Sequence, residues 1–189
     1  MSPAMERTRT SLELANTVLG GGSRRVDLLD SPADLVRWLE GIEPELGPAP
    51  AETGLRLADF RSLREAIRSL FGASATGETV SPEAVETVNS VSAAVSAYPS
   101  LDASDPRVPV VVEVPSAGSR TAEILALLSR SAISLVGGPD RERLRSCGGS
   151  GCGRFFLASR PSQVWCSPAC GNRARVARHH ARRRVARST

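Results

Sequence analysis

Four cysteines lie in the last quarter of this 189-residue chain, in two close pairs. They are Cys147, Cys152, Cys166 and Cys170, spaced as C-x4-C-x13-C-x3-C. Each short turn can present two thiolates to one metal ion, and the spacer brings the chain back for the second pair. The sequence therefore predicts one structural Zn²⁺ per chain. Four thiolates leave no open coordination position, so we do not expect the ion to be catalytic.

Other uses of the four cysteines are an iron–sulfur cluster, two disulfides or free buried thiols. Disulfides suit secreted chains, and no segment of the sequence resembles a secretory signal or a membrane span. Free buried cysteines have no reason to occur in two short-spaced pairs. A zinc site explains both the number of the cysteines and their spacing.

The residues around the cysteines predict how the site is built. Four glycines surround the first pair and allow a tight turn. Ser167-Pro168 is typical of a helix start, which places Cys166 just before a helix and Cys170 in its first turn. Phe155, Phe156 and Trp165 lie in the spacer, where we expect them to form an apolar plug; the alternative is stacking on nucleobases.

The predicted helix after Cys170 is rich in arginine. One narrow stripe of this helix could pack on the metal turn, the segment around Cys147 and Cys152. The stripe consists of Cys170, Ala174, Ala177, Ala181 and Val185. Basic and polar side chains surround this stripe: Arg175, Arg178 and Arg182 on one flank, Arg173, Arg184 and Arg187 on the other, and Arg183 with Asn172 near the opposite face. No carboxylate balances them, so a polyanion is the expected partner. His179 and His180 are surplus to a four-cysteine site and are expected in solvent or against phosphate.

The charge of the whole chain is divided unevenly. All 20 acidic residues lie at or before Glu142, where 13 arginines leave a net charge of −7. The rest of the chain carries 11 arginines and no acid. Such a division favours nucleic acid as a partner. Duplex DNA is the first candidate, and RNA or an acidic protein surface is the alternative.

Residues 1–140 read as a mainly helical domain. Ser31-Pro32 and Ser81-Pro82 predict helix starts, a third helix follows Ser119, and residues 63–71 repeat apolar side chains with helical spacing. Val108–Val114 is the clearest strand, and Pro99–Pro106 reads as a loop. The expected fold class is α+β, with a small β component in the domain of residues 1–140 and a four-cysteine zinc finger with a basic helix in residues 141–189.

Beyond these patterns, the segment Cys170-Gly171-Asn172-Arg173 resembles the CGNR zinc-finger family of bacterial proteins. Cys152 followed by Phe155-Phe156, then Ser159-Arg160 and Trp165-Cys166-Ser167, match it in order and spacing over residues 147–187. Upstream, residues 12–18, Asp27-Leu28-Leu29 and Ser31 to Leu39 resemble the ABATE domain that usually precedes this finger. Ala158 and Gln163-Val164 depart from the pattern, where many members carry an acidic residue and a basic pair.

The resemblance implies a stress-induced transcription regulator of the cytoplasm whose N-terminal domain binds a small-molecule effector. Asn172 and Arg173 could read bases or brace the metal turn, and both interpretations stay open. Asn16 is the one N-terminal polar residue nominated for ligand binding, although a plain hydrogen bond explains it as well. A single finger spans few base pairs, which favours a homodimer. No nucleophile motif or phosphate loop indicates an enzyme. The alternative function is a zinc-scaffolded RNA- or protein-interaction module.

Overall fold

A computed structural model describes residues 10–20, 25–42, 46, 55–116 and 118–185, with the backbone alone for Glu113 and residues 178–185. Residues 10–15 are helical, and the order of the following elements is β1 (Val18–Leu19), β2 (Val26–Asp27), α2 (Pro32–Gly41), α4 (Leu57–Thr76), α5 (Pro82–Ala93), β3 (Ala97–Asp102), β4 (Val110–Pro115), α6 (Arg120–Gly137), the 3₁₀ turn η3 (Pro139–Arg143), β5 (Leu144–Ser146), β6 (Phe155–Leu157) and α7 (Pro168–Val185). Among the described residues, the strands form three antiparallel two-stranded sheets. The predicted α+β class is confirmed.

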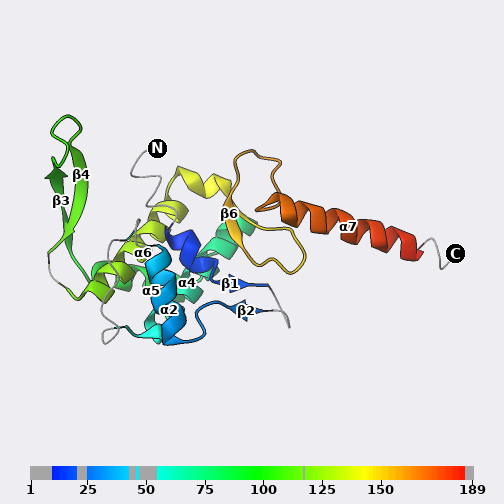
Figure 1. Cartoon of the computed structure of the whole chain (residues 1–189), viewed down its shortest axis with the longest axis horizontal. Helices are drawn as coiled ribbons and strands as arrows, with labels where there is room; N and C mark the ends of the chain where they lie inside the picture. The colour runs from blue at the N-terminus through cyan, green and yellow to red at the C-terminus, as the bar shows by residue number, and fades with distance from the viewer. Residues whose placement is uncertain (1–9, 21–24, 43–45, 47–54, 117, 186–189) are drawn as a thin grey trace.

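Helix α4 is the centre of the fold and packs against α5, α6 and β5 (Figure 1). Its apolar stripe is buried, with Phe60, Ile67 and Phe71 fully enclosed. Burying a side chain of this size contributes about 1.5–3 kcal/mol to folding. The helical spacing of residues 63–71 therefore predicted the correct element and the correct face.

Helices α2, α5 and α6 begin at the predicted positions, and each has a serine at its N-cap. Ser31 forms a capping box with Asp34, and Pro32 occupies the first turn of α2. The hydroxyls of Ser81 and Ser119 accept hydrogen bonds from backbone N–H groups at the starts of α5 and α6. Each cap satisfies a donor that the helix itself leaves without a partner.

The predicted loop at Pro99–Pro106 is wrong in its first half. Residues 97–102 form β3, which pairs with β4 in a ribbon that extends from one end of the molecule (Figure 1). The prolines suggested a loop because proline cannot donate to a sheet. A two-stranded ribbon has only edge strands, where alternate residues need no donor, so Pro99 is tolerated opposite Glu113. The second strand begins at Val110 and not at Val108.

An ion pair whose arginine is buried ties β1 and β2 to α4. Asp27 accepts two hydrogen bonds from Arg64, at 2.5 and 2.6 Å, and the Arg64 side chain is only 2% exposed. Arg64 also donates to the Thr17 hydroxyl at 3.1 Å. Burial works to raise the pKa of Asp27, but the hydrogen bonds from Arg64 and from the Leu29 backbone outweigh it and lower that pKa.

The C-terminal segment joins the same core and then leaves it. Leu144 of β5 and Phe155 of β6 are buried in the cluster formed by the N-terminal helices. Helix α7 projects away from the body, at the end opposite the β3–β4 ribbon (Figure 1). The expected packing of its alanine stripe holds at Cys170, which is buried, and is lost by Ala177, which is exposed. Within the described part of the chain, no helix has the length and hydropathy needed to cross a membrane.

We expect Asp27→Asn to lower the free energy of unfolding by about 3 kcal/mol, because it removes the carboxylate charge that pairs with the buried Arg64 and leaves that side chain its longer ion pair with Glu65, at 3.3 Å. The lowered pKa of Asp27 stabilises the fold above its unfolded value near 3.8, and this contribution is lost as the pH falls through the folded-state pKa. The variant should therefore lose less stability than the wild type below about pH 4. Urea unfolding across a pH series measures both effects.

The matched control is Asp59→Asn, which removes an exposed pair with Arg56 whose N–O distance is 3.7 Å. It should change stability by less than about 1 kcal/mol. An Asp27 variant as stable as this control would show that the pair with Arg64 does not hold β1 and β2 on α4.

Candidate metal centre and nucleic-acid interface

The four cysteines come from three places in the fold. Cys147 follows β5 and Cys152 lies in the turn before β6. Cys166 precedes α7, and Cys170 is the third residue of that helix. The helix start at Pro168 places the second pair as the sequence predicted. The backbone N–H of Cys147 donates to the Arg154 carbonyl at 2.8 Å, which closes the first turn.

The sulfur atoms are arranged for one ion. The Sγ atoms of Cys152, Cys166 and Cys170 are separated by 3.6–3.7 Å, and all four ligand atoms lie within 4.8 Å of one another. Tetrahedral zinc with Zn–S bonds of about 2.3 Å places its sulfurs about 3.8 Å apart. All four cysteines are free, so the disulfide alternative is not formed. A cluster of several iron atoms would hold the sulfurs farther apart. The cofactor is one structural zinc.

The electrostatics of the thiols also favour a cation. Burial and three neighbouring thiols raise the pKa of Cys166 to about 12. Burial opposes ionisation of Cys170 as well, but its interactions with Ser167 and the other cysteines lower its pKa to about 7. Four adjacent thiolates repel one another, and a dication removes that repulsion. The protein would hold the ion with Cys147, Cys152, Cys166 and Cys170. The ion would supply the positive charge that offsets the repulsion between their thiolates.

Two N–H donors and one glycine complete the surroundings of the sulfurs. The backbone N–H of Cys166 points at Cys147 Sγ, 3.3 Å away, and the Arg173 guanidinium donates to Cys170 Sγ at 3.0 Å. A Cβ atom at Gly149 would lie 3.2 Å from Cys170 Cβ and 3.4 Å from Cys147 Sγ. A side chain at Gly149 would crowd both ligands, so the glycine favours the close approach of this turn to them.

The segment Gly171-Asn172-Arg173 braces the start of α7. Gly171 is buried, and an added Cβ would lie 3.3 Å from the Trp165 ring. The Asn172 side-chain oxygen accepts a hydrogen bond from Arg175. Arg173 reaches a zinc ligand, which is the contact expected of the bracing interpretation. Asn172 and Arg173 are exposed, and base reading by them stays a prediction.

The predicted nucleic-acid residues are described to different extents. Arg175 is exposed on α7. Arg178, Arg182, Arg183 and Arg184 lie on the same helix together with His179 and His180, but their side chains are outside the described part of the chain. Arg187 also lies outside the described residues. Contact of these arginines with nucleic acid therefore stays a prediction.

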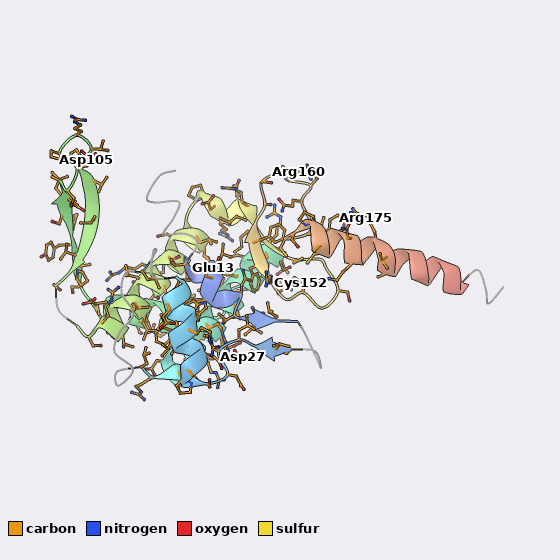
Figure 2. The ribbon with its side chains drawn as sticks, in the orientation of Figure 1. Glu13, Asp27, Asp105, Cys152, Arg160 and Arg175 are labelled. Atoms are coloured by element: carbon orange, nitrogen blue, oxygen red, sulfur yellow. The ribbon has the colours of Figure 1, made fainter. Side chains whose placement is uncertain are left out.

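Two exposed arginines outside α7 were not among the residues predicted from the sequence to contact nucleic acid. Arg154 lines a hollow together with Arg173, and Arg160 lines a second hollow together with Arg175, on the other side of the helix start. Arg160 and Arg175 lie on one side of the finger in Figure 2. Their signal in the sequence was the absence of acidic residues after Glu142, which included them as well as the helix.

Asn16 faces the finger. Its side-chain oxygen accepts from the Phe155 N–H at 2.9 Å, and its amide donates to the Phe155 carbonyl at 3.0 Å. This pair of bonds is the plain hydrogen bonding that the sequence left open. Asn16 also borders a hollow of about 420 Å³ with Glu13 and Arg143, and ligand binding there stays a prediction.

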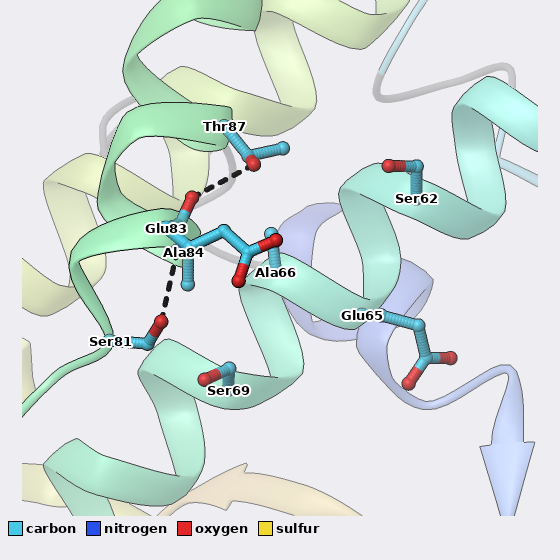
Figure 3. Close-up of a pocket in the computed structure, with 8 residues that line it drawn as sticks. All are labelled: Ser62, Glu65, Ala66, Ser69, Ser81, Glu83, Ala84 and Thr87. Carbon is cyan, nitrogen blue, oxygen red and sulfur yellow. Dashed lines mark hydrogen bonds between the residues drawn. The ribbon is translucent and has the colours of Figure 1, made fainter.

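Another hollow, of about 290 Å³, lies between α4 and α5. Figure 3 shows the polar side chains that line it, with Ser69 on α4 towards Ser81 at the start of α5 and the Glu65 carboxylate pointing away from α5. The hydroxyls of Ser81 and Thr87 are used within α5, as a helix cap and in a bond to the Glu83 carbonyl. This hollow does not contain the nominated Asn16.

Changing any one of the four zinc ligands to serine should abolish stoichiometric zinc binding, because a hydroxyl is a poor substitute for a thiolate. Native mass spectrometry should find one zinc per wild-type chain. Since Cys166 is protonated at neutral pH without the ion, zinc binding should release protons and weaken as the pH falls. The control is Ser150→Ala, in the same turn but outside the ligand set. Full zinc retention in a ligand variant would contradict the assignment.

Two known protein-family models together match most of the chain. Residues 8–139 match the ABATE family, described as "Putative stress-induced transcription regulator", and residues 143–183 match the CGNR zinc finger. Among curated proteins no match was found. With a family match over more than half of its length and the four ligands in place, the chain belongs to the ABATE family and carries a C-terminal CGNR zinc finger.

Proposed function

We propose that this protein is a bacterial, cytoplasmic transcription regulator that binds duplex DNA through its zinc finger and α7. The observation that carries this proposal is the charge of the C-terminal segment. From Arg143 onward the chain has 11 arginines and no acidic residue, while the preceding part is acidic. The description of the family supports regulation of transcription.

The fold supports contact with phosphates at the start of α7. The hollow with Arg154 and Arg173 and the hollow with Arg160 and Arg175 flank this helix start. The exposed guanidinium groups can bind phosphate bidentately. With 18 residues, α7 is about 27 Å long, a helix of the kind that a major groove admits.

We propose that the chain regulates transcription and does not catalyse a reaction. Four thiolates fill a tetrahedral zinc shell, so the ion has no position for a substrate. We further propose that a small-molecule effector acts from the N-terminal domain in a stress response. The hollow around Asn16 supports this, because Phe155 and Phe156 of the finger form part of its wall.

The test compares two triple variants that remove the same charge. Arg175, Arg178 and Arg182→Ala should lower DNA affinity at least tenfold and reduce the slope of log K against log salt by about three, because three phosphate contacts are lost. The control replaces Arg37, Arg56 and Arg107, which are exposed outside the finger. Electrophoretic mobility shift with a random duplex pool, across a salt series, provides the measurement.

A matched RNA pool and a zinc chelator complete the design. The proposal predicts that duplex DNA is preferred and that chelation abolishes binding. Equal affinity of the two triple variants would remove α7 from the mechanism. Preference for RNA at the same salt would replace the proposal with an RNA-associated module.

A further inference from the structure

The N-terminal domain holds the segment of the finger that carries a zinc ligand. The Cys152 carbonyl accepts a hydrogen bond from the Gly20 N–H at 2.9 Å, and the Gly153 carbonyl accepts one from Arg68 at 3.2 Å. Two residues later, Asn16 satisfies both the N–H and the carbonyl of Phe155. The backbone from residue 152 to residue 155 is therefore fixed from outside the finger.

Apolar packing secures the same segment. The Phe155 ring is 8% exposed and meets Phe71 of α4 edge to face, with ring centroids 5.7 Å apart. The Arg68 guanidinium lies 5.2 Å from the centre of the same ring and donates to the Ala15 carbonyl at 2.5 Å. Arg68 thus links the first helical turn, α4 and the metal turn. The Arg68 side chain is partly buried in this contact, and the burial lowers its pKa.

The two glycines on either side of Cys152 differ in what surrounds them. Gly151 and Gly153 both have φ of +68°, where a side chain is strained. A Cβ atom on Gly151 would meet no atom within 4 Å, whereas one on Gly153 would lie 2.3 Å from the Gly20 carbonyl oxygen. Gly153 therefore serves the contact with the N-terminal domain in addition to the turn.

We infer that the N-terminal domain is part of the zinc site, with Asn16, Gly20 and Arg68 as positioning residues that set the zinc affinity through Cys152. Partners that orient metal ligands change affinity by about 10–100-fold when they are removed. The coupling is reciprocal. A change in residues 16–20, the N-terminal turn, weakens zinc binding, and loss of the ion destabilises that turn. This inference concerns the metal and does not depend on DNA binding.

The first test compares Gly153→Ala with Gly151→Ala in the full-length, zinc-loaded protein. Both variants place a side chain at a φ of +68°, and only Gly153→Ala pushes the turn away from Gly20. Competition with a colorimetric chelator should give a zinc dissociation constant at least about tenfold higher for Gly153→Ala than for Gly151→Ala. Equal constants for the two variants would overturn the inference.

The second test leaves the turn unchanged. Asn16→Ala should raise the zinc dissociation constant about tenfold, and Asn89→Ala, an exposed asparagine on α5, should leave it unchanged. Val88→Ala destabilises the buried face of α5 without touching the finger and controls for general instability. Each constant is measured where circular dichroism shows a folded chain. The inference fails if Asn16→Ala binds zinc like the wild type, or if Val88→Ala weakens binding equally.

Discussion

A finger of about forty residues is too short to bury enough apolar surface for its own stability, and the structure follows from this constraint. One solution is the zinc ion, which draws together four thiolates that would otherwise repel one another. The other is insertion of Leu144 and Phe155 into the core built by the N-terminal helices. The position of the metal turn thus depends on α4, although no zinc ligand lies in the N-terminal domain.

This arrangement distributes rigidity unevenly across the finger. The turn around Cys152 is held by Asn16, Gly20 and Arg68, while α7 leaves the body after its first turns (Figure 1). At the start of α7, arginines from the loops of the finger and arginines from the projecting helix line the same hollows. The backbone of residues 152–155, which the N-terminal domain holds, includes Arg154 and so joins the N-terminal contacts to one of these hollows.

Local patterns in the sequence predicted the features that local physics decides. The cysteine spacing identified the metal ligands, and Ser31, Ser81 and Ser119 marked helix starts because each cap acts within one turn. Long-range contacts could not be predicted in this way. Asn16 and Phe155 are 139 residues apart, so nothing near Asn16 in the sequence indicates its partner. The ribbon strand at Pro99 was missed because its pairing, and not its residue preferences, makes it a strand.

The central claim is that the zinc site and the N-terminal turn form one cooperative unit. Hydrogen exchange measured on the zinc-loaded and the chelated full-length protein tests it most directly. Chelation should increase exchange at residues 10–20 and in α4 around Arg68, while the interface of α5 with α6 keeps its protection. Changes confined to residues 143–185 would show that the finger loses its metal without any response from the N-terminal domain, and would contradict the account.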